Sequence, residues 1–213
     1  MCTAMSYRNP VYLAKVAATA DIISGGRVQM GIGGGWYEHE WKAYGYGFPS
    51  AGVRLARLDE GVQIMREAWR RGEVSFPDFK HYPVEGAIVE PKPLQDGGLP
   101  LWIAGGGEQK TLRLVARYAD ACNLFPTPEI AHKLDVLRAH CETEGRDYAA
   151  IEKSSMYRFD VGENGEKVDE AIGGLRWLAS MGIQKVHASV TNVYDIKPLE
   201  IIAERILPIA AEI

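Results

Sequence analysis

The chain has 213 residues, a formal net charge of −4 and 46% hydrophobic residues. These values are ordinary for a soluble globular protein, so they exclude disordered, collagen-like and coiled-coil classes and argue against nucleic acid as a partner. The sequence contains no apolar run of about 18 residues and no secretory signal pattern, so it predicts no membrane span.

Helical and strand patterns alternate from the start of the chain. A helix is predicted over 9–24, where Pro10 suits the first turn. A short strand over 28–32 follows and runs into glycines. Apolar residues at spacings of three and four then predict a helix over 54–70. Residues 73–98 contain several prolines, and we expect them to form an irregular excursion over the body of the protein.

The second half of the chain repeats a strand followed by a helix. Together with the strand over 28–32, these make five strands in tandem, with residues 1–6 as the tail of another, and they predict a parallel α/β sheet. Such a sheet is either a closed barrel or an open doubly wound layer, and a barrel needs eight strands. The predicted elements are strand 99–104, helix 109–118, strand 121–126, helix 129–144, strand 152–161, helix 168–181, strand 185–190 and helix 198–212.

Two glycine loops follow buried strands. The first, GIGGGW at 31–36, departs from a dinucleotide fingerprint because Trp36 stands where a third glycine is needed. This loop either makes a sharp turn or lines a ligand site at the carboxyl end of its strand. Trp36 itself either packs against a ligand or covers the core.

The second loop, GGGEQKT at 105–111, lacks the glycine spacing of a P-loop. A triple glycine between a strand and a helix nevertheless exposes backbone N–H groups at a helix N-terminus, and that geometry attracts phosphate. A tight turn without a ligand is the alternative. The Thr111 hydroxyl and the Lys110 ammonium are candidate phosphate contacts, and an exposed surface position explains Lys110 equally.

Candidate residues for chemistry are few. Glu38, His39 and Glu40 follow the first glycine loop and are weak candidates for proton transfer, although acids at the start of a solvated helix explain them as well. No Ser-His-Asp or Cys-His arrangement stands out, which agrees with an enzyme whose cofactor carries the chemistry.

The cysteines carry no metal or disulfide signal. Cys2, Cys122 and Cys141 are odd in number and lack CxxC spacing. We therefore expect free thiols, no metal site and a reducing, cytoplasmic location.

Taken together, the motifs resemble one family. YRNP, LAKxAATxDxxSGGR, GIGGGWYEHE, AYG, EPKPLQ, PLWIAGGG and TLRLVARYAD occur in that order, densely over residues 6–126. This sequence is similar to the luciferase-like monooxygenase superfamily, in particular to its flavin- or deazaflavin-dependent (coenzyme F420) oxidoreductases. The resemblance implies a TIM-type (β/α)8 barrel with the cofactor ring over the carboxyl ends of the strands.

The resemblance also assigns positions. A strand bulge with a non-prolyl cis peptide is expected near residues 1–3, and Asp21, Arg27 and Asp120 are expected to support the fold. The first glycine loop would lie beside the ring, and the second would hold the cofactor phosphate. The implied cofactor-binding residues are Cys2, Thr3, Gly33, Gly34, Gly35, Trp36, Gly105, Gly106, Gly107, Glu108, Gln109, Lys110 and Thr111.

Family members begin with two complete βα units and a further strand that this sequence lacks. We therefore expect residues 1–213 to form a single, N-terminally shortened barrel domain without about its first two to three strands. The expected protein is a cytoplasmic homodimer that uses F420 or FMN to transfer hydride or activate oxygen on a small organic substrate. A catalytically incompetent barrel fragment, or a subunit that depends on a partner, is the alternative, and an open nucleotide-binding domain is a third.

Overall fold

A six-stranded sheet forms the centre of the computed structural model, which describes residues 2–213. The strands are in the order β1-β2-β5-β6-β7-β8, and every neighbouring pair is parallel. The predicted parallel α/β architecture is thus confirmed, and β1 is the strand expected at the N-terminus. The strands are β1 (Thr3–Ala4), β2 (Met30–Gly33), β5 (Leu101–Ala104), β6 (Ala121–Leu124), β7 (Glu152–Phe159) and β8 (Lys185–Val190).

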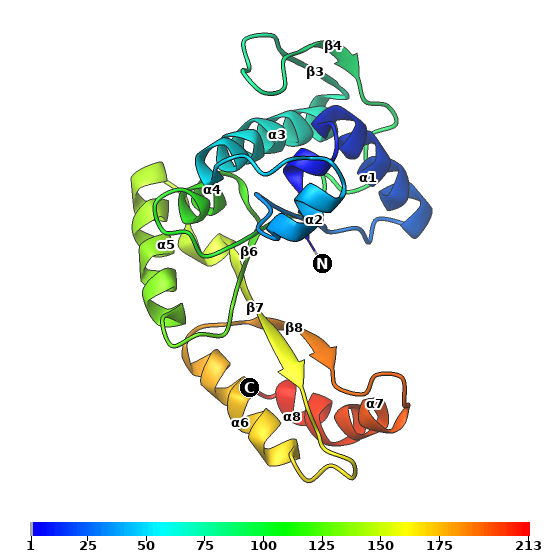
Figure 1. Ribbon diagram of the computed structural model, residues 1–213, viewed down its shortest axis with the longest axis vertical. Coiled ribbons are helices and arrows are strands. Elements are labelled where there is room, and N and C mark those ends of the chain that lie inside the picture. Colours follow the sequence, from blue (N-terminus) through cyan, green and yellow to red (C-terminus); the bar gives the residue numbers. More distant parts are fainter. Residues whose placement is uncertain (1) are drawn as a thin grey trace.

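The helices cover one face of this sheet, and the molecule has the shape of an open arc (Figure 1). Right-handed crossovers between parallel strands place their helices on one side. None of the helices in residues 2–213 is long and apolar enough to cross a membrane. The longer helices are α1 (Pro10–Ser24), α3 (Ala51–Arg71), α4 (Thr111–Tyr118), α5 (Ile130–Glu144) and α6 (Val168–Ser180), and 3₁₀ turns occupy Met5–Tyr7 and Tyr148–Ala150.

The alternation of side chains along the strands separates the core from the opposite face. Ile32 and Ile103 are partners on neighbouring strands, are fully buried and belong to the main hydrophobic core. The next residues, Gly33 and Ala104, therefore point to the other face, as does Asn123, the partner of Ala104. The carboxyl end of the sheet thus presents small and polar groups on its inner face.

Local capping sets the ends of the first helices. Asn9 accepts hydrogen bonds from the backbone N–H groups of the first turn of α1, and Gly25 ends α1 in the left-handed conformation. Helix α3 begins at Ala51 rather than at residue 54, because the Ser50 side chain caps it.

Two parts of the sequence prediction are wrong in detail. Residues 73–98 are not irregular throughout, because β3 (Glu73–Phe76) and β4 (Val84–Ile88) form an antiparallel pair. The Glu60 carboxylate of α3 accepts backbone hydrogen bonds from residues 80–82 and fixes the connecting loop. The helix predicted over 198–212 is divided into α7 (Lys197–Ile201), a π-helical turn (Ile202–Ile206) and α8 (Leu207–Ala210).

Asp21 is a structural carboxylate, as the family resemblance implies. It is fully buried in α1 and accepts hydrogen bonds from the backbone N–H groups of Val28, Leu94 and Gln95 and from the Gln95 amide. Burial by itself raises the pKa of Asp21, but these hydrogen bonds outweigh it and hold the pKa below its usual value. One side chain therefore joins α1, the start of β2 and the end of the 73–98 segment.

Asp120 and Arg27 also stabilise the fold, each through a hydrogen bond to the backbone. The Asp120 carboxylate accepts a hydrogen bond of 2.8 Å from the Leu101 N–H and lies 3.6 Å from Arg66. Arg27 donates 2.7 Å to the carbonyl of Ser24 at the end of α1.

We predict that Asp21→Asn lowers the free energy of unfolding by about 2 kcal/mol at pH 7, because the amide nitrogen cannot accept these hydrogen bonds. Because the pKa of Asp21 is lower in the folded than in the unfolded protein, its ionised carboxylate stabilises the fold. This stabilisation is fully present above the unfolded pKa of about 4 and is lost as the pH falls through the folded pKa. Urea unfolding at pH 7 and at pH 3 measures both effects.

Asp96→Asn is the matched control, since Asp96 is exposed and close in sequence to the same segment. An Asp21→Asn protein as stable as the Asp96→Asn protein at pH 7 contradicts the structural role.

Candidate active site

A cavity of about 980 Å³ opens at the carboxyl ends of β1, β2, β5 and β6. Its floor is the inner face of the sheet, where Ala4, Gly33, Ala104 and Asn123 line it. The volume lies at the upper end of the range found for small-molecule sites, roughly 300–1,000 Å³. A site at this edge of a parallel sheet is the usual place for ligands in such folds.

The first glycine loop forms one wall of the cavity and has no room for side chains. Gly35 has a φ of +78°, and a Cβ there would lie 2.6 Å from the Trp41 ring. A Cβ on Gly34 would lie 3.2 Å from Leu55 Cδ2. The three glycines therefore bring bare backbone to the cavity, with Trp41 and Leu55 closing the space behind it.

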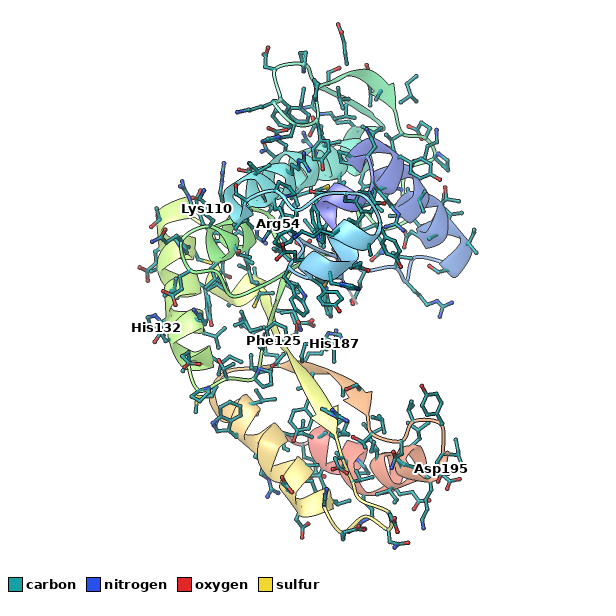
Figure 2. The ribbon with its side chains drawn as sticks, viewed as in Figure 1. Arg54, Lys110, Phe125, His132, His187 and Asp195 are labelled. Carbon is teal, nitrogen blue, oxygen red and sulfur yellow. The ribbon has the colours of Figure 1, made fainter. Side chains whose placement is uncertain are left out.

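Arg54 fixes this loop in place. Its Nε donates 3.1 Å to the Gly35 carbonyl, another guanidinium nitrogen donates to the Pro49 carbonyl, and the guanidinium carbon lies 4.0 Å from the centre of the Phe48 ring. Figure 2 shows Arg54 close to α2 (Glu38–Ala43) and to the start of α3. Arg54 is thus a positioning residue that holds the glycine loop through two of its guanidinium nitrogens.

Trp36 does not cover the core. Its side chain is 76% exposed, and it lines the cavity next to Tyr37, with 5.4 Å between the two ring centres. The tryptophan that fills the interior is Trp41, which is fully buried. Of the two alternatives for Trp36, a cover for the core is wrong, and its contact with a ligand stays a prediction.

The structure separates the three proton-transfer candidates on α2. Glu40 lines the cavity, and one of its carboxylate oxygens accepts a hydrogen bond of 2.8 Å from the Tyr7 hydroxyl. Glu38 is exposed and forms an ion pair of 2.7 Å with Lys42. His39 is exposed as well, and neither it nor Glu38 lines the cavity. Only Glu40 is therefore positioned to meet a bound molecule.

Tyr7 is a site residue that sequence reasoning missed. Burial, and then the hydrogen bond to Glu40, raise the pKa of Tyr7 to about 12. Its ring stacks on Tyr46 with 4.7 Å between centres and packs against Trp41 at 5.1 Å. The phenol therefore keeps its proton at neutral pH and serves as a donor to Glu40. YRNP contains Tyr7, but nothing local in the sequence shows that Glu40 is its partner.

The second glycine loop reaches the cavity at its two ends. Gly105, which has a φ of +124°, and Thr111 line the cavity, whereas the implied cofactor residues between them do not. Within the described part of the chain, the backbone N–H groups of residues 106–111 donate no hydrogen bond. These N–H groups precede and begin α4, and free backbone donors at a helix N-terminus are what an anion site uses.

The remaining implied residues have varied surroundings. The Glu108 carboxylate pairs with Lys133 and lies 3.5 Å from His132, both on α5, and the bond to Lys133 lowers the pKa of Glu108. Figure 2 places His132 on the convex side of the arc. Gln109 and Lys110 are exposed.

The N-terminal strand also contributes to the cavity. Cys2 and Thr3 both line it. Within residues 2–213 the cis peptide bond is Glu90–Pro91, so the expected non-prolyl cis peptide is not found there, and Met1 lies outside the described residues.

We predict that Gly35→Ala destabilises the protein by about 3 kcal/mol. About 1 kcal/mol comes from the left-handed backbone, and the rest comes from the collision of the new methyl group with Trp41. Thermal unfolding and the near-ultraviolet circular dichroism of the tryptophans report both effects.

Gly45→Ala isolates the backbone contribution, because Gly45 has a φ of +76° and a methyl group added there would meet no other atom within 4 Å. Equal destabilisation by the two substitutions contradicts the close packing of Gly35 on Trp41.

Comparisons with known proteins agree with this geometry. The sequence is 33% identical over 171 residues to the phthiodiolone/phenolphthiodiolone dimycocerosates ketoreductase of Mycobacterium sp. (strain JLS), covering 78% of this chain and 43% of that protein. It is 29% identical over 214 residues to the F420-dependent glucose-6-phosphate dehydrogenase of Mycobacterium leprae (strain Br4923), covering 92% of this chain and 60% of that protein. The chain thus spans about half the length of these curated relatives.

The fold has solved counterparts. The monooxygenase RslO1 from Streptomyces bottropensis matches 97% of this chain and 76% of its own, with a TM-score of 0.79 and 18% sequence identity. This likeness confirms the predicted fold class, the luciferase-like TIM-type architecture. The model of the family described as luciferase-like monooxygenase matches residues 1–201. The chain therefore belongs to the luciferase-like monooxygenase family.

Proposed function

We propose that this chain binds coenzyme F420 or FMN in the cavity and forms the cofactor site of an oxidoreductase that acts on a small organic substrate. The observation that carries the proposal is the meeting of two glycine loops, from the adjacent strands β2 and β5, around one cavity. The names of the relatives, an F420-dependent dehydrogenase and a ketoreductase, support this class of chemistry.

The phosphate end of the cofactor fits the second loop. The free N–H groups of residues 106–111 and the Thr111 hydroxyl supply hydrogen-bond donors at the positive end of the α4 dipole. Glu108 does not oppose an anion there, because Lys133 neutralises its carboxylate. With the Glu108 carboxylate neutralised, the charges around this loop are compatible with one bound phosphate group.

The ring end fits the first loop. The glycines at 33–35 present their backbone to the cavity, and a side chain at position 35 has no room. The fully buried Trp41 packs behind Gly35 and supports this backbone. When bound, a flavin or deazaflavin supplies hydride transfer, and a reduced flavin also supplies oxygen activation.

Glu40 is the residue that we assign to proton transfer. In alcohol oxidation, the substrate would lose a hydride from carbon, for which a bound oxidised flavin or deazaflavin would be the acceptor, and a proton from its hydroxyl, which the Glu40 carboxylate would accept. Tyr7 orients the carboxylate through its 2.8 Å hydrogen bond and keeps its own proton. Tyr7 is therefore a positioning residue.

The domain and assembly expectations remain proposals. We propose that residues 1–213 act as one domain and that the protein assembles as a homodimer. Strands β1 and β8 are the edge strands of the sheet, and within the described residues each pairs with a single neighbour. A longer chain or a partner subunit would add further strands or side chains at these edges. Cofactor binding, rather than turnover, is accordingly the primary test for this chain.

We predict that Thr111→Val weakens binding of FMN or F420 about tenfold, because a hydroxyl donor to the phosphate is lost. Riboflavin and the phosphate-free chromophore of F420 lack this group, so their affinities should not change. Fluorescence titration with each matched pair of ligands measures the difference.

Thr143→Val on α5 is the control, since its hydroxyl bonds to the carbonyl of Ala139 on the same helix. If wild-type protein binds neither cofactor, the proposed function fails. If Thr111→Val weakens FMN and riboflavin equally, the placement of the phosphate fails.

We predict that Glu40→Gln lowers kcat for alcohol oxidation about a hundredfold while the dissociation constant of the cofactor stays within about twofold of wild type. The amide oxygen still accepts the Tyr7 hydrogen bond, but it takes up no proton. Stopped-flow measurement of cofactor reduction separates binding from the chemical step.

Glu38→Gln, which changes an exposed neighbour paired with Lys42, should retain wild-type kcat. Equal losses in the two variants contradict the specific role of Glu40.

A further inference from the structure

The cavity has an exposed aromatic rim. We define the aromatic rim as five side chains that line the cavity and are 45–76% exposed: Trp36, Tyr37, Tyr44, Tyr46 and Phe125. Large apolar side chains that cluster around a cavity and remain exposed are typical of a binding surface for an apolar ligand.

We propose that the substrate of this site is a neutral, apolar molecule that carries a carbonyl or hydroxyl group on a ring-containing or similarly flat body, and that phosphorylated substrates are excluded. This inference deepens the proposed function and rests on it. It names the class of substrate that the described wall of the cavity would recognise.

The rim lies apart from the proposed phosphate loop. Four of its residues belong to the segment 36–46, which contains α2, and Phe125 directly follows β6. Figure 2 shows Phe125 on the concave side of the arc. The phosphate loop, in contrast, leads from β5 into α4 and reaches the cavity through Gly105 and Thr111. A cofactor held at that loop with its ring beside the glycines at 33–35 leaves the rim for the substrate.

Three of the five rim rings, Trp36, Tyr37 and Tyr46, pack against another ring. Tyr46 stacks on Tyr7, with an angle of 16° between the rings, and its hydroxyl donates to the Tyr7 carbonyl at 3.4 Å. Trp36 packs against Tyr37. Rings that are already in place bind a flat apolar partner with little further loss of side-chain entropy.

The charges of the cavity wall do not suit a phosphate ester. Arg54 is engaged with Gly35, Pro49 and Phe48, and Glu40 is an acid that would repel an anion. Two arginines line the cavity within residues 2–213: Arg8, which donates 3.1 Å to the Thr3 hydroxyl, and Arg54, which is held by the carbonyls of Gly35 and Pro49. A dianion would meet these two cations, both already bonded within the protein, beside one carboxylate, whereas phosphate sites in proteins gather several donors and cations.

Two probes with the same ring system test the proposal. Binding of 2-acetylnaphthalene and of 2-naphthyl phosphate is measured by equilibrium dialysis, in the absence and in the presence of saturating FMN or F420. We expect the ketone to bind saturably with the cofactor in place and at least about tenfold more tightly than the phosphate ester, since the charged group gains too few partners to repay its desolvation.

Substitutions in the rim should weaken ketone binding specifically. Phe125→Ala and Tyr44→Ser should each raise the dissociation constant of the ketone about threefold to tenfold, the amount expected for loss of one aromatic contact. Tyr12→Ser is the matched control, because Tyr12 is 63% exposed on α1 and does not line the cavity, while Tyr44 is 68% exposed. Cofactor affinity should not change in any of the three.

Four outcomes overturn the inference. Tighter binding of the phosphate ester, abolished by Arg8→Gln, shows an anionic substrate site. Displacement of the ketone by cofactor shows that the ketone occupies the ring position. Equal ketone affinity in the rim variants and in Tyr12→Ser shows that the rim takes no part, and failure of the ketone to bind rejects the proposal outright.

The same titrations distinguish the two proposals. Cofactor binding without ketone binding leaves the proposed function standing and rejects only the substrate class. Ketone binding without cofactor binding rejects the proposed function and, with it, the assignment of the ketone as a substrate.

Discussion

The strict alternation of side chains along parallel strands is the constraint on which the rest of the structure depends. Ile32 and Ile103 turn toward the helices and join the core, so the residues that follow them must face the opposite way. Because parallel strands all end at one edge, the loops after β2 and β5 then converge above that face. The cavity is thus a consequence of how the core is buried.

A second layer of packing fixes the shape of that cavity. Gly35 lies directly against Trp41, whose ring leaves no room for a Cβ, and Arg54 holds the same loop through the Gly35 carbonyl. Helix α2, which supplies Trp41, also carries Glu40. The position of the proposed proton acceptor therefore depends on the packing of a fully buried tryptophan, and the loop, the helix and the carboxylate form one unit.

Sequence reasoning recovered the elements whose signals are local. The strands and helices between residues 99 and 190 have apolar periodicity, and their boundaries agree with the structure to within a few residues. The pair β3 and β4 was not predicted, because its stability comes from Glu60 of α3 and from stacking of Phe76 on Phe79 rather than from its own sequence pattern. Likewise, the glycine spacing identified both loops. It did not show that the Glu108 side chain pairs with Lys133 of α5 instead of lining the cavity.

The parallel α/β architecture, the two glycine loops and the family could all be predicted from the order of residues, because periodicity and ordered motifs are properties of neighbouring residues. The tertiary structure alone decided which of Glu38, His39 and Glu40 reaches the cavity, since that choice depends on a hydrogen bond from Tyr7, 33 residues away. It also decided that Trp36 is exposed while Trp41 is buried. Such distinctions arise from contacts between distant segments, which a linear pattern of residues does not record.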